Sequence, residues 1–387
     1  MTTNPGALGF DESRLSHVRA QLEHDVQTER CHGASLLVAR RGQIVLDHTL
    51  GHADRASNKK LSRDAVFTSL SVGKQFTTAL VLGLVERGAL QLHQTVASVI
   101  PEFGRFGKER VTLFQLLTQT SGLQSSIPAV APDVLMSIEK LTDYACRSAL
   151  ESLPGARVNY SIAVAHSVMA AMALRVAGRG RSFTRMMDED LFEPLGMRDT
   201  ALGPRADLLA RWCPIRAAYK EAGLFEPAAI EGIQHLVATP GAELPAGGYL
   251  TTVRDMHRFA EMLRRGGELD GARVLSPAMI DYATHNQTGE RPNELWNYTT
   301  GFRGWDVFPA YLGIGFFLRG ERPTPGPWGS LNSPRTFGGI GAGSTAFWVD
   351  PERELTFAFG STGLMEDSFH IERVARLSNQ VVSAIVR

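Results

Sequence analysis

The chain has 387 residues, 43% of them hydrophobic and 21% charged, which is the composition of a globular protein with a large buried core. Its 40 acidic and 40 basic side chains cancel, so no net field attracts nucleic acid or an anionic membrane, and neither partner is expected. The longest apolar stretch, Ala79 to Val85, is too short to span a bilayer.

The N-terminus, MTTNPGALGF, shows no basic segment followed by an apolar stretch, so it does not have the pattern of a secretory signal. The three cysteines, Cys31, Cys146 and Cys213, are widely spaced and form no CxxC motif. Their odd number and spacing argue against a disulfide framework or a zinc site, so we expect free buried thiols. Together these features predict a cytoplasmic protein.

The first predicted element is a helix that Asp11 caps and that runs to about Thr28. Two strands rich in valine, leucine and isoleucine follow at 34–39 and 43–50. The Arg-Gly pair at 41–42 separates them and provides the turn, since glycine tolerates the backbone conformations of tight turns. The N-terminal part of the chain is therefore predicted to be a helix followed by a β-hairpin.

A strongly apolar helix is predicted to begin at Ser71 and to end at Gly88, a typical helix-terminating residue. It follows a polar loop at 54–64 and the strand-like residues 65–67. Its apolar side chains recur at intervals of three and four, as expected for a helix with a buried face. They are Phe76, Leu80, Val81, Leu84 and Val85.

The remainder of the chain has a helical middle and strands toward the C-terminus. Helices are predicted at 113–117, 138–150, 163–177 and 253–265, paired strands at 345–349 and 355–360, and a closing helix at 368–386. We therefore predict an α/β lobe made from residues 1–95 and 240–387 and an all-helical lobe made from residues 96–239.

Three Ser-x-x-Lys matches occur, and their surroundings differ. Ser57–Lys60 lies in a polar loop and Ser137–Lys140 in a helical stretch with no helix start, so both are interpreted as chance matches. Ser71–Lys74 opens the apolar helix, and its spacing brings the hydroxyl and the amine within mutual reach. Because the helix dipole and an apolar environment disfavour the ammonium form, the lysine can accept the serine proton. A capping serine with a snorkelling lysine explains the local pattern equally well.

Several segments, in consistent order, resemble the serine β-lactamase and penicillin-binding family, specifically its class C-like branch with the family VIII esterases. These segments are FTSLSVGKQFT at 67–77, LLTQTSGL at 116–123, PG at 154–155 with YS at 160–161, PLGMRDT at 194–200, PAGG at 245–248, GELDG at 267–271 and LSP at 275–277. The resemblance covers nearly the whole chain from Asp11. It implies a β-lactamase/transpeptidase-like α/β fold, with a central antiparallel sheet flanked by helices plus an all-helical lobe. It also implies an active site between the two lobes, with Ser71 as the nucleophile.

The resemblance also implies roles for residues outside the serine helix. Tyr160 takes the place of the tyrosine that acts with Lys74 as general base and later protonates the leaving group. A phenol suits that role only if neighbouring positive charge lowers its pKa from about 10. The third motif, a substrate-binding strand, falls on Gly339, Ile340 and Gly341. The amide of Ala342 then completes an oxyanion hole with the amide of Ser71.

Two departures from the family pattern affect the expected substrate. Ile162 stands where the family commonly has asparagine, so an amide that would hold the lysine and bind a substrate is missing, and this wall becomes apolar. The third motif contains no lysine or histidine, so no cation there binds a substrate carboxylate. Both changes argue against efficient β-lactam recognition. Gln119, where the family often has histidine, is interpreted as structural.

Neither a cofactor nor a metal is expected. The glycine-rich stretch at 338–343 precedes a strand pattern, so a phosphate would find no helix N-terminus of the kind that dinucleotide sites use. His166 lies on an apolar helix and is interpreted as a core or rim histidine.

The sequence thus predicts a serine hydrolase that forms an acyl-enzyme at Ser71, foremost an esterase acting on a small acyl ester. Its partner is a small-molecule acyl substrate, and the oligomeric state is left open. A biosynthetic transacylase that forms amides, a β-lactamase or D-peptidase, and a non-catalytic scaffold on the same fold are the alternatives. Aromatic residues between 296 and 328 include candidates for the walls of an acyl pocket.

Overall fold

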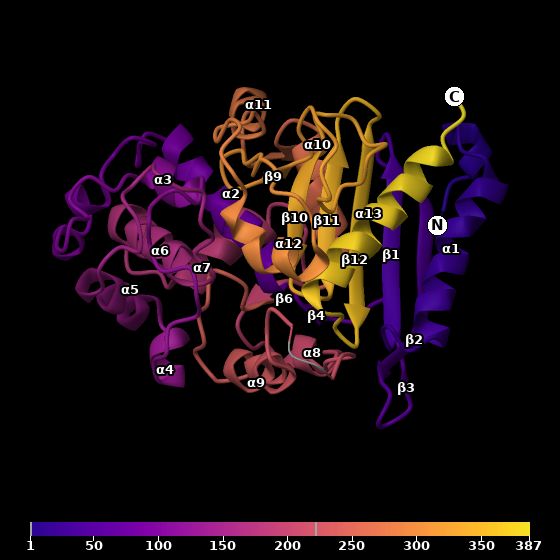
Figure 1. The fold of residues 1–387 in the computed structure, drawn as a ribbon, viewed down its shortest axis with the longest axis horizontal. Helices are drawn as coiled ribbons and strands as arrows, with labels where there is room; N and C mark the ends of the chain where they lie inside the picture. Colours follow the sequence, from indigo (N-terminus) through magenta and orange to yellow (C-terminus); the bar gives the residue numbers. More distant parts are fainter. Residues whose placement is uncertain (1, 221–222) are drawn as a thin grey trace.

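A seven-stranded antiparallel sheet built from both ends of the chain forms the centre of the protein (Figure 1). The computed structural model describes residues 2–220 and 223–387, and in it the strand order is β3-β2-β1-β12-β11-β10-β9. The strands are β1 (Gly33–Arg40), β2 (Gln43–Asp54), β3 (Lys59–Lys60), β9 (Phe317–Leu318), β10 (Phe337–Gly341), β11 (Thr345–Asp350) and β12 (Leu355–Thr362). The N-terminal hairpin β1–β2 joins the C-terminal strands through the pairing of β1 with β12.

The predicted hairpins are confirmed, and the turn between β1 and β2 has the expected chemistry. Arg41 and Gly42, between β1 and β2, both have positive φ, at 54° and 75°. Such a turn matches the twist of the two strands, and glycine adopts it without steric cost. The pairing of β11 with β12 runs from Thr345 opposite Gly360 to Asp350 opposite Leu355. Both hairpins therefore follow from local sequence.

Two pairs of helices cover the two faces of this sheet (Figure 1). Their bounds are Glu12–Gln27 (α1), Asp367–Ser383 (α13), Gly73–Glu86 (α2) and Val253–Arg264 (α10). Side chains alternate along β1, so Leu36 enters the core under α1 and α13, whereas Leu37 enters the core under α2 and α10. Phe259 of α10 packs edge-to-face on Phe347 of β11, with ring centroids 5.5 Å apart.

The segment 96–239 consists mainly of helices joined by long irregular connections and lies beside the sheet, against α2 (Figure 1). Its α-helices are α3 (Leu113–Leu117), α4 (Pro132–Leu135), α5 (Ile138–Arg147), α6 (Val164–Ala177), α7 (Phe183–Met187), α8 (Ala206–Leu209) and α9 (Pro227–Val237). The expectation of an all-helical segment is wrong at one point. The strand β5 (Ala201–Leu202) pairs with β6 (Tyr249–Thr251), which also pairs with β4 (Phe67–Thr68). The predicted division into two lobes stays a prediction.

Further short strands and helices complete the fold. The other short elements are β7 (Glu268–Leu269), β8 (Ala272–Arg273), α11 (Pro277–Ala283) and α12 (Asn297–Arg303).

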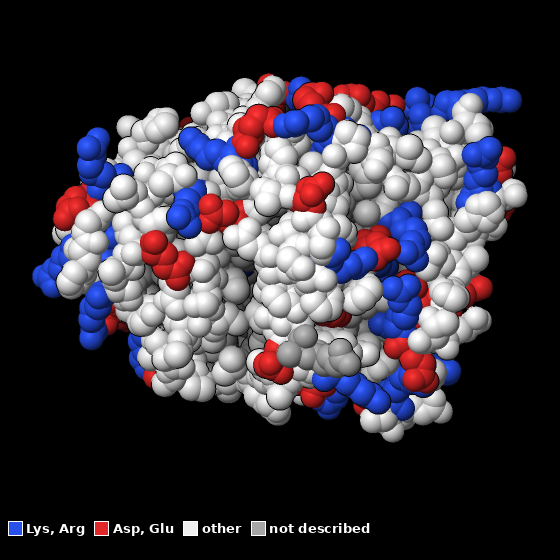
Figure 2. Space-filling model, viewed as in Figure 1, with Lys and Arg blue, Asp and Glu red and all other residues white. Residues whose placement is uncertain are grey.

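The three cysteines are free and buried, as predicted. Within the residues that the structure describes, no helix is long and apolar enough to cross a membrane, and no group of three or more His, Cys, Asp or Glu side chains could hold a metal. Figure 2 shows acidic and basic side chains intermingled on one face of the molecule.

Candidate active site

Ser71 lies in a single turn of 3-10 helix, Leu70–Val72, directly before α2. The prediction that Ser71 itself opens the α-helix is therefore corrected by two residues. Leu70 has φ at 47°, in the left-handed region that a branched side chain rarely adopts. Gly247 permits this turn, because a Cβ at 247 would lie 2.8 Å from the carbonyl oxygen of Leu70. A strained turn, fixed by a distant segment, thus presents the Ser71 hydroxyl.

Lys74 is buried in the first turn of α2 and faces Ser71. Its Nζ lies 3.3 Å from the Ser71 Oγ and donates to the carbonyl oxygens of Ile162, at 2.7 Å, and Ala246, at 3.0 Å. Burial lowers the pKa of this lysine to about 7, because desolvation penalises the ammonium form. A substantial fraction of the amine is therefore neutral near neutral pH and able to accept the hydroxyl proton.

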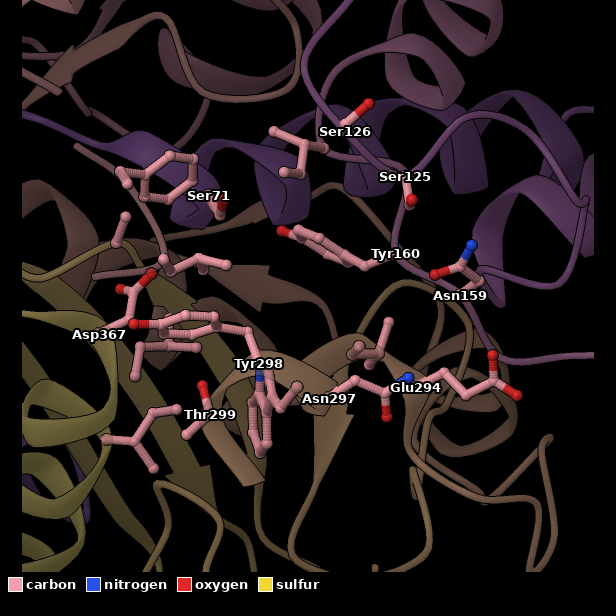
Figure 3. A pocket seen from close by; sticks show the side chains of 18 of the residues that line it. Ser71, Ser125, Ser126, Asn159, Tyr160, Glu294, Asn297, Tyr298, Thr299 and Asp367 are labelled. Carbon is pink, nitrogen blue, oxygen red and sulfur yellow. The ribbon is translucent and has the colours of Figure 1, made fainter. Parts of the chain in front are cut away.

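The Tyr160 hydroxyl points toward Ser71 across the same cavity (Figure 3). Its ring lies beneath Lys74, with Nζ 4.8 Å from the ring centroid. Burial raises the pKa of this phenol; a hydrogen bond with Ser71 opposes the rise, and the negative charge of Asp367 adds to it. The lowered phenol pKa that the family role requires is therefore not observed in this arrangement. Lys74, rather than Tyr160, is the group whose pKa lies near neutrality.

Gln119 braces the segment that carries Tyr160, which agrees with its interpretation as structural. Its side-chain Oε1 accepts a hydrogen bond from the Ser161 N–H at 2.9 Å, and its carbonyl accepts one from the Asn159 N–H at 2.9 Å. Ser161 in turn accepts from the Ala165 N–H at 3.2 Å, at the start of α6. The backbone on both sides of Tyr160 is thereby fixed.

Only the end of the third-motif strand, β10, and the turn that follows it line the cavity. Ile340, Gly341 and Ala342 line the same cavity as Ser71. Gly339 does not line it: a Cβ there would collide with the side chain of Gln75. A lysine or histidine at 339 therefore has no room while Gln75 keeps this position.

Two backbone amides are free to receive an oxyanion. Ala342 follows β10 in the hairpin turn, and Ser71 follows the strained residue 70. Among the described residues, neither the Ser71 nor the Ala342 N–H donates a hydrogen bond to the protein. Because both residues line one cavity, the arrangement predicted for the oxyanion hole is geometrically available.

The cavity has a volume of about 510 Å³ and predominantly apolar walls. Trp296, Tyr298 and Phe317, three of the aromatic residues considered for an acyl pocket, line it. Ile162 lines it as well, so this wall is apolar as predicted. Such walls suit a small hydrophobic acyl chain.

Sequence reasoning missed Asp367, which also lines the cavity. It is the first residue of α13, and its Oδ1 accepts a hydrogen bond from the Gly343 N–H at 2.9 Å. Burial raises the pKa of this carboxyl to about 7. An acidic residue in the first turn of a helix is ordinary in sequence, so no local signal distinguished it.

His166 is buried at the start of α6, and burial together with the nearby Lys74 lowers the pKa of its imidazole well below the usual range. It is therefore neutral at physiological pH, in agreement with its interpretation as a core histidine.

We expect kcat/KM for an uncharged ester to rise with pH through an inflection near 7. Only unprotonated Lys74 can accept the Ser71 proton, and its pKa is about 7. Initial rates measured from about pH 5.5 to 9 test this. Since Asp367 also has a pKa of about 7, the variant Asp367→Asn must retain the inflection. A flat profile in the wild type, or loss of the inflection in that variant, contradicts the assignment to Lys74.

Replacing Ile162 by asparagine tests the apolar wall. The backbone carbonyl that holds Lys74 remains in this variant, so only the side chain lining the cavity changes. We expect the kcat/KM ratio of the p-nitrophenyl ester of N-acetylglycine to that of pentanoate to rise about two- to tenfold, the value of one new hydrogen bond. An unchanged ratio would show that substrates do not contact residue 162.

Comparison with known proteins agrees with the family that the sequence motifs resemble. A family model described as Beta-lactamase matches residues 18–379. The chain is 27% identical over 355 residues to the esterase/beta-lactamase LipL of Mycobacterium tuberculosis, with 84% of this chain and 76% of that protein covered.

Solved structures with a similar fold include a family VIII carboxylesterase, with a TM-score of 0.76, 22% identity and coverage of 94% of this chain and 97% of that chain. They also include EstCE1, described as a hydrolase with promiscuous acyltransferase activity, with a TM-score of 0.78, 19% identity and coverage of 96% and 99%. At these identities the likeness concerns the fold alone.

Proposed function

The chain belongs to the beta-lactamase family, and from this premise we propose that it is a serine hydrolase that forms an acyl-enzyme at Ser71 and acts as an esterase on small acyl esters. The observation that carries the proposal is the buried Lys74 amine, which lies 3.3 Å from the Ser71 Oγ and has a pKa lowered to about 7. A serine hydroxyl is a weak nucleophile until an adjacent base takes its proton.

In the proposed acylation step, Lys74 Nζ accepts the Ser71 proton while Oγ attacks the ester carbonyl carbon. The carbonyl oxygen becomes an oxyanion that accepts hydrogen bonds from the Ser71 and Ala342 amides; removing one such donor typically costs ~3 kcal/mol of transition-state stabilisation. The Tyr160 hydroxyl then donates its proton to the departing alkoxide and regains one from the Lys74 ammonium. The free alcohol leaves, and the acyl group remains on Oγ.

In the proposed deacylation step, water replaces the Ser71 hydroxyl as the nucleophile. Lys74, neutral again, takes a proton from water through Tyr160, and the hydroxide attacks the acyl carbon. Collapse of the second tetrahedral intermediate returns the proton to Ser71 Oγ and releases the acid. Apart from the substrate and water, the proposed steps use only groups of this chain.

The geometry supports an esterase over a β-lactamase. Penicillins and D-peptides carry a carboxylate, yet among the described residues that line the cavity there is no lysine or arginine to receive it. Gln75 occupies the space beside Gly339 where the third-motif cation would extend. An uncharged acyl chain packed against Ile162, Ile340 and Phe317 needs no cation in the cavity.

Acyl transfer to an amine or alcohol is the second candidate. The cavity of about 510 Å³ has room for an acceptor beside a short acyl chain. EstCE1, which shares the fold, is described as a hydrolase with promiscuous acyltransferase activity, so this fold is compatible with acyl transfer. Transfer and hydrolysis share the acyl-enzyme and differ only in the nucleophile that resolves it.

Turnover assays of wild type and Ser71→Ala distinguish the candidates. We expect the wild type to hydrolyse p-nitrophenyl butyrate, Ser71→Ala to show only background rates, and nitrocefin to be cleaved far more slowly than the ester. An added primary amine that diverts product from acid to amide supports transfer. A wild type indistinguishable from Ser71→Ala on all acyl donors contradicts both candidates and leaves the scaffold alternative.

A further inference from the structure

The charges that line the cavity are unbalanced. Two carboxylates, Asp367 and Glu294, reach it, and no lysine or arginine lines it within the described part of the chain. Glu294 has a partner, since the Arg157 guanidinium lies 3.5 Å from its carboxylate. Asp367 forms no ion pair among the described residues, and no cation is close enough to offset the cost of burying its charge. An unpaired carboxylate in an apolar cavity is costly unless a ligand balances it.

The Asp367 carboxyl is held in a fixed position beside the reaction centre. Its Oδ1 accepts the Gly343 N–H at 2.9 Å, one residue after Ala342 of the proposed oxyanion hole. Its Oδ2 makes no hydrogen bond to the described protein residues and so can meet a ligand. Burial is the main cause of the raised pKa of Tyr160, and the negative charge of Asp367 adds to it. In Figure 3, Asp367 and Ser71 border the same cavity.

Aromatic rings line the same cavity as this carboxyl. Tyr298 of α12 lies beside Asp367 in Figure 3, and Trp296 and Phe225 line the same cavity. Aromatic faces attract ammonium groups through their quadrupole, and alkylated ammonium groups favour sites that combine such rings with a carboxylate. The Tyr298 ring is held in place by stacking on Phe302, with centroids 5.7 Å apart.

We propose that Asp367, with the Tyr298 ring, binds an ammonium group of the substrate, so that the substrates of this enzyme are esters that carry a positive charge. The inference rests on the proposed function, because it concerns the same cavity and the same acyl transfer. Asp367 is a specificity-determining residue in this account, and Ser71, Lys74 and Tyr160 perform the chemistry. Anionic esters are disfavoured by the same carboxylate.

Matched esters test the preference for positive charge. The acyl-side set consists of p-nitrophenyl γ-(trimethylammonio)butyrate, its carbon isostere with tert-butyl in place of trimethylammonium, and p-nitrophenyl hemiglutarate. The alcohol-side pair consists of two esters, acetylcholine and its tert-butyl isostere 3,3-dimethylbutyl acetate. We expect the cationic ester to exceed its isostere in kcat/KM by about tenfold or more in at least one set, after correction for uncatalysed hydrolysis, and hemiglutarate to be the poorest substrate. Ratios near one or below in both sets overturn the proposal.

Two variants separate a charge effect from a change of shape. Asp367→Asn keeps an acceptor for the Gly343 N–H but removes the charge, so the cation-to-neutral ratio should fall about tenfold. Glu294→Gln is the matched control, since its carboxylate is already paired with Arg157, and its ratio should stay within about twofold of wild type. Equal ratios in wild type and Asp367→Asn overturn the assignment to Asp367.

A binding measurement distinguishes failure of this inference from failure of the proposed function. Ser71→Ala is titrated calorimetrically with γ-(trimethylammonio)butyramide and with its tert-butyl isostere. If no ester is hydrolysed but the cation binds about tenfold more tightly and loses this advantage in Ser71→Ala/Asp367→Asn, the cation site stands and the esterase proposal fails. If neutral esters are hydrolysed through Ser71 without any charge preference, the esterase stands and the cation site fails.

Discussion

Replacing Lys74 by alanine is expected to lower kcat for a p-nitrophenyl ester about a thousandfold, within the range attributed to a positioned general base. The variant removes the amine 3.3 Å from the Ser71 Oγ and leaves the hydroxyl with no neighbouring base of suitable pKa. Because the carbonyls of Ile162 and Ala246 then lose their donor, circular dichroism and thermal unfolding must show that the fold persists.

The chain provides its own control for this experiment. Lys140 ends one of the other Ser-x-x-Lys matches, and it lies on the surface, where its amine pairs with Asp133 at 2.6 Å. Lys140→Ala should retain kcat within about twofold, as expected for an exposed ion pair. Near-normal rates in folded Lys74→Ala would mean that proton transfer from Ser71 does not depend on this amine.

Replacing Tyr160 by phenylalanine is expected to lower kcat/KM for an ethyl ester, which reports the acylation step, about a hundredfold or more, because the ring remains and only the proton-donating hydroxyl is lost. The raised pKa of this phenol keeps it protonated at neutral pH, which suits donation to the leaving group. The loss should therefore be smaller for p-nitrophenyl esters, whose leaving group needs little protonation, than for ethyl esters.

Tyr144→Phe is the matched control for this variant. Its hydroxyl donates to the Gln124 side chain at 2.6 Å and does not line the cavity. Rates in Tyr144→Phe should match wild type. Equal losses of kcat/KM on activated and unactivated esters in Tyr160→Phe would contradict its role as the donor to the leaving group.

The parts of the fold that depend on local sequence could be predicted. The helix capped by Asp11, the hairpin around Gly42 and the C-terminal strands with their closing helix all appear within a few residues of their expected bounds. The β-lactamase/transpeptidase-like fold and the family, which the resemblance implied, are confirmed by the family match and by the similar structures. Periodicity and turn chemistry suffice for such elements because their determinants lie within a few residues.

The features that the sequence did not predict depend on contacts between distant segments. The left-handed backbone of Leu70 is accommodated because Gly247, which is distant in sequence, packs against it. β5 forms because β6, nearly fifty residues later, supplies its partner. Periodicity contains no information on such pairings.

In the candidate site, too, the local features could be predicted from the sequence and the features that depend on tertiary contacts could not. The pairing of Ser71 with Lys74 follows from helical spacing, but the carbonyls that bury and hold the amine come from two remote loops. The raised pKa of Tyr160 and the inward position of Asp367 likewise arise from tertiary burial. Gly339 was expected to contact substrate, and only its packing against Gln75 shows that it faces away from the cavity.

Covalent labelling tests the central claim most directly. The wild-type protein is incubated with a fluorophosphonate and digested, and the modified peptide is located by mass spectrometry, with Ser71→Ala treated in parallel. The account predicts a single adduct on the Ser71 hydroxyl and none on Ser71→Ala. An adduct on another side chain, or equal labelling of the two proteins, would contradict it.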